Sequence, residues 1–212
     1  TLGRRQELAE LAAKLDLVFL EDDAYGDLIF EGERPAALYS IAGRERVIKM
    51  GTFSKLIAGG MRLGWALAEP GDIATMCGLK ADSATGPFAA WAAADYLAGG
   101  ALTKRVPALR QLYRDRRDAM LEELAPLAEL GCTWSRPVGG FFVWLTLPEG
   151  VDSEAIRPAI EDHGVGYLAG HHCFADGVRR RDIRLAYSYL PEADIREAAR
   201  RLVRGLQATL PG

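Results

Sequence analysis

A lysine stands among small hydroxyl residues just after a predicted strand at residues 47–50. Thr52 and Ser54 precede Lys55, and Arg62 follows seven residues after the lysine. Hydroxyl groups and a guanidinium just past the carboxyl end of a strand suit the binding of a phosphate group. Lysine amines form Schiff bases with carbonyl compounds and become nucleophilic when they are desolvated. The segment therefore predicts covalent carbonyl chemistry beside a bound anion; taken alone, it is also typical of a solvated loop.

A run of three acids, residues 21–23, and then Tyr25 follow the apolar segment 17–20. The apolar segment is typical of a strand that is buried on both faces of a parallel sheet. If this strand neighbours the one before Lys55, a carboxylate and a phenol face the same crevice at the carboxyl ends of the strands. A solvated turn is the alternative interpretation of the three acids.

In combination, these motifs resemble the class I/II aminotransferases, which are pyridoxal 5′-phosphate (PLP) enzymes of fold type I. The match is nearest to the branch that includes 2-aminoadipate, kynurenine and broad-range aromatic or branched-chain aminotransferases, and it covers nearly all of the chain. The motifs that carry it are Asp22-x-x-Tyr25, Thr-x-Ser-Lys55, Arg62-Leu-Gly-Trp, Pro137-Val-Gly-Gly-Phe-Phe-Val-Trp and Arg184-Leu-Ala-Tyr.

The resemblance implies PLP as the cofactor and gives three residues a role at its ring. Lys55 would form the Schiff base with the cofactor and, once released by the incoming amino acid, would carry a proton as the general base. Asp22, rather than its acidic neighbours, would pair with the protonated pyridine nitrogen, because only its offset from Tyr25 fits the family motif. Tyr25 would donate a hydrogen bond to the 3-oxygen of the ring.

The resemblance also implies two anion sites. Thr52 and Arg62, with Ser54 assisting, would hold the phosphate of the cofactor. Arg184 would bind the α-carboxylate of the substrate, because a planar two-pronged donor matches the geometry of a carboxylate. Taken without the resemblance, Arg184 is more typical of a surface ion pair, and its place at the start of a late apolar strand, as in the family, reverses that interpretation.

Residues 171–173, two histidines and a cysteine, resemble a metal cluster at first sight. Adjacent side chains on an extended segment point to opposite sides, and tetrahedral sites prefer ligands that are separated by turns. In the family this segment is a loop near the substrate entrance. We therefore predict no metal site.

The spacing of apolar residues predicts an α/β fold for the first part of the chain. Helices at 3–15 and 87–98 alternate with short apolar strands at 17–20, 47–48 and 63–68, as in a mostly parallel sheet covered by helices. The resemblance identifies residues 1–100 as the C-terminal part of the PLP-binding large domain of fold type I.

A long helix and a smaller α+β domain are predicted for the rest of the chain. Residues 101–128 would form an interdomain helix that Pro107 and Pro126 kink or bound. Residues 129–212 would form the small C-terminal domain. It would contain strands at 132–135, 140–147, 165–168 and 182–187 and helices at 152–163 and 191–209.

Composition excludes several classes of function. The 212 residues are 49% hydrophobic and 26% charged, and a net charge of −3 offers no field for nucleic acid or an anionic membrane. No apolar segment approaches the ~20 residues that span a bilayer. Three widely spaced cysteines indicate a reducing, cytoplasmic location rather than a disulfide framework. The expected partners are an amino acid, a 2-oxo acid and a second copy of the chain, because the resemblance implies a homodimer.

Some parts of the family's active site are not found in the chain. They are a glycine-containing phosphate loop, an aromatic residue that stacks on the ring, and an asparagine that contacts the 3-oxygen. We therefore expect a longer protein with an N-terminal portion of comparable length, so that the site is incomplete here. Two alternatives stay open: another fold-type-I enzyme, either a lyase or a decarboxylase, and an aminotransferase-like sensor domain of a transcription regulator. Arg184 weighs mildly against decarboxylation, because it would retain the carboxylate.

Overall fold

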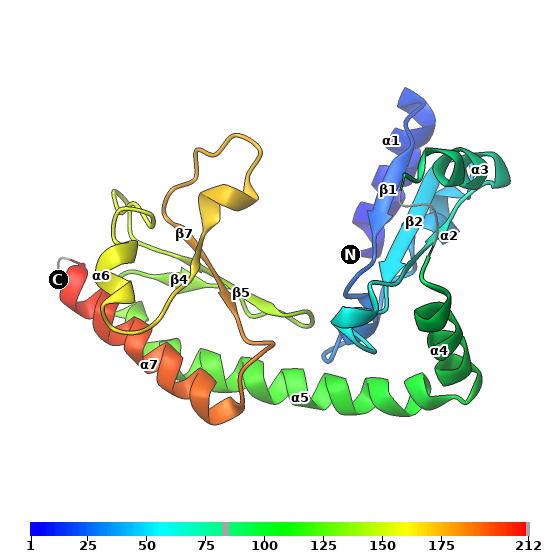
Figure 1. Ribbon diagram of the computed structural model, residues 1–212. Helices are drawn as coiled ribbons and strands as arrows, with labels where there is room; N and C mark the ends of the chain where they lie inside the picture. The colour runs from blue at the N-terminus through cyan, green and yellow to red at the C-terminus, as the bar shows by residue number, and fades with distance from the viewer. Residues whose placement is uncertain (82–84, 211–212) are drawn as a thin grey trace. The chain divides into compact units, whose positions relative to one another are not determined.

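The computed structural model describes residues 1–81 and 85–210, which form two compact units (Figure 1). The first unit is Thr1–Leu109 and the second is Arg110–Gly212. The division falls inside the long helix that the sequence predicts as a joint. Each unit combines helices with one sheet, and the predicted α/β fold class is confirmed.

Three strands form the sheet of the first unit, in the order β1-β2-β3. β1 (Phe19–Asp22) and β2 (Val47–Thr52) are parallel, whereas β3 (Gly64–Leu67) is antiparallel to β2. The prediction that the segment 63–68 forms a parallel strand is therefore wrong. A parallel connection needs a crossover of a dozen or more residues, usually with a helix, and the short loop between β2 and β3 permits only a reversal of direction.

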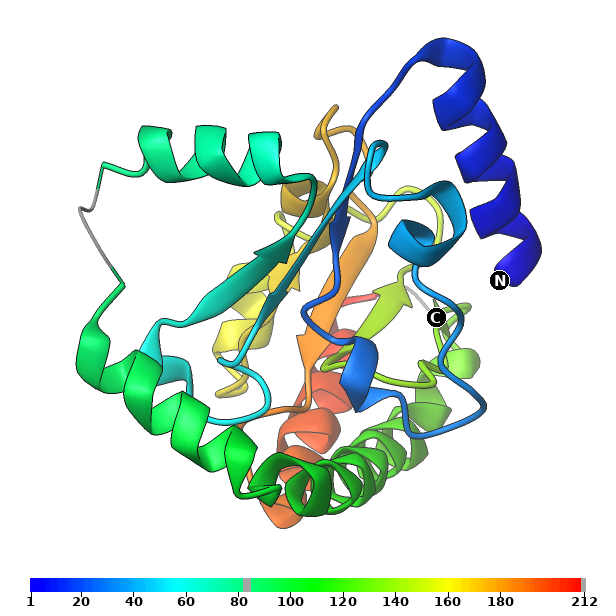
Figure 2. The same cartoon turned by 90° about the vertical axis from the view of Figure 1, so that its right-hand side faces the viewer.

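The apolar segment before and within β1 is exposed rather than buried on both faces. The exposed fractions are 41% for Leu17, 56% for Val18 and 66% for Leu20. β1 lies at the edge of the sheet, and α1 (Leu2–Leu15) and α2 (Leu38–Ala42) lie together on one side of it (Figure 2). Burial on the other face would need further elements, and the described residues supply none there.

Two of the helices in the first unit follow from local signals in the sequence. The Thr1 hydroxyl accepts a hydrogen bond from the backbone N–H of Arg4 (3.3 Å) and caps α1. Pro87 opens α4 (Pro87–Ala98), where its missing N–H costs nothing. Two other helices were not predicted: α2, which is short, and α3 (Pro70–Leu79), whose glycines and evenly spread apolar residues give no helical periodicity.

The long helix α5 (Ala101–Leu124) continues through Pro107 and ends just before Pro126. Pro126 therefore bounds the helix as predicted, whereas Pro107 does not. The second unit then forms a four-stranded antiparallel sheet in the order β4-β5-β7-β6. The strands are β4 (Thr133–Trp134), β5 (Phe142–Thr146), β6 (Leu168–Ala169) and β7 (Asp182–Ala186).

The core of the second unit lies between one face of this sheet and two helices, α5 and α7 (Glu192–Thr209) (Figure 1). Alternate residues of β5 and β7 are buried there, together with a helical stripe of α7. These residues are Val143, Leu145, Ile183, Leu185, Ile195, Leu202 and Leu206. The predicted helix at 152–163 is reduced to α6 (Arg157–Glu161). The opposite face of the sheet is left for polar and aromatic side chains.

Candidate active site

The register of β1 and β2 separates the three acids onto two faces of the sheet. Asp22 is paired with Met50, and Glu21 with Lys49. Paired residues of parallel strands share a face, and successive residues alternate. Asp22 therefore lies on the same face as Met50 and Thr52, and Glu21 lies on the other. β1 and β2 thus bring a carboxylate and a hydroxyl to one face of the sheet.

Glu21 has a structural role. Its carboxylate accepts hydrogen bonds from the backbone N–H groups of Leu38 (2.8 Å) and Tyr39 (3.0 Å) and from Nη1 of Arg5 (2.6 Å). Burial raises the pKa of this carboxyl, but the hydrogen bonds from Tyr39, Leu38 and Arg5 outweigh burial and hold the pKa below its usual value. Glu21 fastens α1 and α2 to the sheet and is not available to a ligand.

We expect the free energy of unfolding of the Glu21→Gln variant to fall less on acidification than that of the wild type. The folded pKa of Glu21 lies below the usual 4.5, so the ionised carboxylate stabilises the fold above that pH, and this contribution is lost as pH falls through the folded pKa. The variant should lose about 1.5–3 kcal/mol near neutral pH, and its difference from the wild type should shrink in acid. Urea unfolding of the full-length protein across pH measures this. Glu7→Gln, at an exposed ion pair with Arg4, is the control and should change little.

Asp23 is also occupied. It forms ion pairs with Arg34 and with Nζ of Lys49 (2.8 Å). Asp22, in contrast, accepts one backbone hydrogen bond, from the N–H of Ala24 (3.2 Å), and forms no ion pair with any residue in 1–81 or 85–210. Of the three acids, Asp22 is the one whose charge is left for a ligand.

The loop after β2 is held by the hydroxyl of Thr52. This hydroxyl donates to the carbonyl oxygen of Leu63 (3.1 Å) and accepts from the backbone N–H of Ser54 (3.1 Å). The Ser54 hydroxyl makes no hydrogen bond within the described part of the chain. Ser54 is therefore ready to donate to an anion, whereas Thr52 would first have to release Leu63.

Lys55 lies half-buried in the turn that this loop forms. The turn is closed by the backbone N–H of Ile57, which donates to the carbonyl oxygen of Phe53 (2.8 Å). Nε of Arg105, on α5, donates to the carbonyl oxygen of Leu56 (2.9 Å). Sequence reasoning missed Arg105, because 49 residues separate it from its acceptor and no motif links them.

Gly51 permits the close packing of β2 and β3 beside this loop. Gly51 is paired with Trp65, and a Cβ atom on the glycine would lie 2.4 Å from the indole ring. Any larger residue would push the ring away and disturb the strand that leads to Lys55. In the sequence, the glycine directly before the Thr-x-Ser-Lys motif was the feature from which this close contact could have been predicted.

Arg62 has a backbone conformation that is uncommon for a residue with a side chain. Its φ is +51°, in the left-handed region, and such residues are frequent at ligand sites. Its guanidinium is exposed; Nη1 donates to the carbonyl oxygen of Gly59 (3.3 Å) and meets no carboxylate among the described residues. This arginine can accept an anion without giving up an ion pair.

The residues of the first unit fit PLP. Asp22 offers an unpaired carboxylate for a protonated ring nitrogen, and Ser54 and Arg62 offer unpaired donors for a phosphate. Tyr25 follows β1 directly and is half-buried, as Lys55 is. The neighbouring acids and Lys49, which would compete for these roles, are neutralised within the protein.

Arg184 lies on the second sheet, on the face opposite the core. It is paired with Trp144 in β5 and Leu168 in β6, and its guanidinium carbon lies 4.3 Å from the centre of the Phe142 ring. No carboxylate in 1–81 or 85–210 forms an ion pair with it. The ring can hold the guanidinium plane by a cation–π interaction while the donors stay open to an anion.

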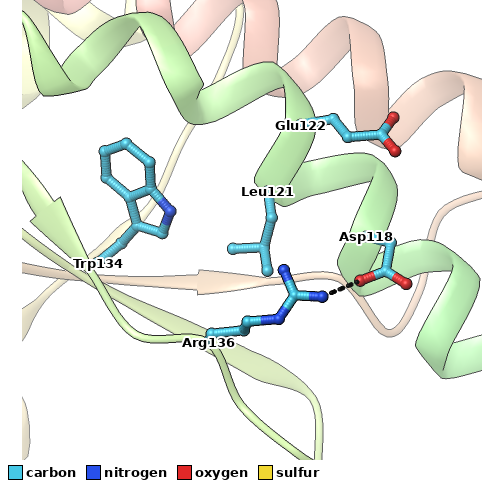
Figure 3. Close-up of a pocket in the computed structure, with 5 residues that line it drawn as sticks. All are labelled: Asp118, Leu121, Glu122, Trp134 and Arg136. Atoms are coloured by element: carbon cyan, nitrogen blue, oxygen red, sulfur yellow. Dashed lines mark ion pairs between the residues drawn. The ribbon is translucent and has the colours of Figure 1, made fainter.

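One pocket of the second unit has a volume of about 420 Å³ and lies between α5 and the start of the sheet (Figure 3). Asp118 and Arg136 line it and approach to 3.6 Å, and Asp118 also pairs with the buried Arg117 at 2.7 Å. The carboxylate of Glu122 turns away toward α7, where it meets Arg196 at 2.6 Å. The charges around this pocket are paired, and none of the predicted site residues lines it.

The segment 171–173 is not extended. It belongs to a short 3-10 helix, η4 (Gly170–Cys173), and the two imidazole rings lie 4.0 Å apart between centres. The argument that adjacent side chains must point to opposite sides is therefore wrong here, because a helical turn does not alternate its side chains as a strand does.

Comparison with known proteins establishes the family. The model of the class I and II aminotransferases matches residues 1–202, and the chain belongs to this family. It is 40% identical to aromatic-amino-acid aminotransferase 1 of Thermococcus litoralis, over 94% of this chain and 48% of that protein. It is 34% identical to the 2-aminoadipate transaminase of Thermus thermophilus, over 99% of this chain and 54% of that protein. The chain spans about half the length of these relatives.

Solved structures agree with the sequence comparison. The kynurenine aminotransferase of Pyrococcus horikoshii, solved in complex with PMP, aligns with a TM-score of 0.92 at 36% identity. The alignment covers 99% of this chain and 52% of that one. The resemblance deduced from the sequence motifs is thus confirmed. Among the described residues, no helix combines the length and the apolar character that crossing a membrane requires.

Proposed function

We propose that the full-length protein is a PLP-dependent aminotransferase that transfers an amino group between an L-amino acid and a 2-oxo acid. The observation that carries this proposal is the selective neutralisation of charges in the first unit. Glu21, Asp23 and Lys49 are held in ion pairs or hydrogen bonds. Asp22, which precedes Lys55 in the sequence, and Arg62, which follows it, form no ion pair among the described residues and can bind a charged ligand. Membership of the aminotransferase family supports the same reaction.

When bound, PLP supplies a protonated ring that draws electrons away from the substrate's α carbon. Lys55 would hold the cofactor and would carry a proton to and from that carbon. Asp22 would keep the ring nitrogen protonated, and Tyr25 would donate a hydrogen bond to the 3-oxygen. Arg62, Ser54 and Thr52 would hold the phosphate.

Arg184 would fix the substrate's orientation. Its two-pronged donor pairs with the α-carboxylate, and the Phe142 ring holds the guanidinium plane. A retained carboxylate favours transamination over decarboxylation. We assign residues 1–100 to the PLP-binding large domain, 101–128 to the helix that joins the domains, and 129–212 to the small domain.

Assembly and location complete the proposal. A cytoplasmic location fits the three free cysteines, Cys77, Cys132 and Cys173, of which two are exposed. A homodimer fits the exposed apolar residues of α4, Phe88 and Trp91, which are 81% and 68% exposed and suit an interface. No role in nucleic-acid binding is proposed for the residues of this chain.

A second candidate is the ligand-sensing part of a transcription regulator. The chain is 32% identical to the HTH-type regulator YisV of Bacillus subtilis, over 94% of this chain and 43% of that protein. A basic helix-turn-helix segment upstream in the full-length protein, together with binding of an amino acid but no turnover, would favour this candidate.

The test of the proposed function uses the full-length protein with PLP. Amino donors are screened against 2-oxoglutarate, and borohydride is added to fix the cofactor before peptide mapping. We expect turnover with at least one donor and the cofactor on a peptide that contains Lys55. Attachment to Lys49 or Lys80 would contradict the assignment, and absence of turnover with every donor would contradict the activity.

A further inference from the structure

We propose that Glu154, His171 and His172 form a binding site for a divalent transition-metal ion of the zinc class. All three residues lie in the second unit. None of them has a role in the proposed aminotransferase reaction, so the inference goes beyond that function and is independent of it.

The three side chains converge. One ligand atom from each lies within 4.8 Å of the other two, and Nε2 of His172 lies 3.9 Å from Oε2 of Glu154. The helical turn of η4 places the imidazole rings side by side, tilted by 37°. The residues come from two segments, the loop before α6 and η4, so an ion would join these two segments.

Two atoms of this cluster are buried without a hydrogen-bond partner among the described residues. They are Oε2 of Glu154 and Nδ1 of His171. Polar atoms left in this state are costly, and a bound ion is one of the ordinary ways in which proteins satisfy them. The second carboxylate oxygen of Glu154, Oε1, is held by Nη2 of Arg157 at 2.8 Å. That contact orients the carboxylate and leaves Oε2 for a metal, as outer partners do in known sites.

The donor set selects the kind of ion. Two imidazoles and one carboxylate bind zinc in proteins, with the fourth tetrahedral position left to water or another ligand. With bonds of about 2.0–2.1 Å, ligand atoms in such a site lie roughly 3.3 Å apart. The ligand atoms, which lie within 4.8 Å of one another, would therefore have to move closer together. The His172 side chain, 52% exposed, is free to make that movement.

The surrounding charges are mixed. Asp152 adds a negative charge near the cluster, and its carboxylate accepts hydrogen bonds from the backbone N–H groups of Glu154 (2.9 Å) and Ala155 (3.3 Å). Arg157 adds a positive charge beside Glu154. Because that charge opposes a cation, the two imidazoles should supply much of the affinity, together with Oε2 of Glu154.

The experiment uses full-length holoprotein without a histidine tag. Zn²⁺ binding is measured by calorimetry, and Co²⁺ replaces it for visible spectroscopy, because tetrahedral Co²⁺ absorbs strongly. We expect one ion per chain. His171→Ala, His172→Ala and Glu154→Gln should each weaken binding at least about tenfold, since loss of outer partners alone costs 10–100-fold. His163→Ala changes the remaining histidine, which lies outside the cluster, and should bind as the wild type does.

Other results would overturn the site. Binding that survives in both His171→Ala and His172→Ala, or that falls equally in His163→Ala, would show that the ion is held elsewhere. A Co²⁺ spectrum that is lost only in Cys173→Ser would assign the ion to the exposed thiol. Circular dichroism of each variant separates loss of binding from loss of folding, and Glu154→Gln keeps the size of the side chain.

Discussion

Asp22→Ala is expected to lower the turnover of the full-length enzyme by orders of magnitude. The cofactor withdraws electrons only while its ring nitrogen stays protonated, and a carboxylate beside that nitrogen maintains the proton. Asp22 is suited to this role because it accepts a single backbone hydrogen bond and no ion pair compensates its charge within the described residues. Steady-state kcat with a good amino donor measures the loss.

Asp23→Ala is the matched control for this prediction. Its carboxylate is already bound by Arg34 and Lys49, so its removal should reduce stability more than turnover. Urea midpoints and kcat measured on both variants separate the two effects. Near-normal kcat in Asp22→Ala together with a collapse of kcat in Asp23→Ala would assign the ring nitrogen to the other acid.

The sequence was sufficient to place the three acids and the lysine loop each at the end of a strand, and the structure shows that the two strands are neighbours. It could not show which acid faces a ligand, because that depends on strand register and on partners from elsewhere in the chain. The carboxylate of Glu21 accepts hydrogen bonds from Arg5 and from α2, and the carboxylate of Asp23 forms ion pairs with Arg34 and Lys49. The family motif selected Asp22, and the hydrogen bonds now supply a physical reason for that selection.

Other features depended on contacts that no local pattern encodes. The direction of β3 follows from the length of its connection to β2, and the tether from Arg105 to Leu56 spans two distant segments. The exposure of Leu20 could not be foreseen from an apolar run, because burial depends on what covers a strand. Residues 171–173 form a helical turn, so the prediction that their side chains point to opposite sides, which assumed an extended backbone, was wrong.

Arg184→Lys is expected to lower kcat/KM for amino acids by about ten- to hundredfold. Lysine keeps the positive charge but loses the two-pronged geometry, and a hydrogen bond to a charged group is worth about 1.5–3 kcal/mol. The stacking of the guanidinium on Phe142 would be lost as well. The visible spectrum of the bound cofactor should not change, because the proposed contact of Arg184 is with the substrate and not with the cofactor.

The substrate and the control variant decide whether this loss reflects carboxylate recognition. Amines without a carboxylate never use the clamp, so their slow turnover should fall far less than that of amino acids. Arg179→Lys is a matched control in the same unit, because Arg179 also stacks on an aromatic ring, that of Phe174, with 4.9 Å from the guanidinium carbon to the ring centre. It should leave kcat/KM nearly unchanged. Equal losses for amino acids and amines in Arg184→Lys would make Arg184 a structural residue, because removal of a carboxylate clamp cannot slow a substrate that has no carboxylate.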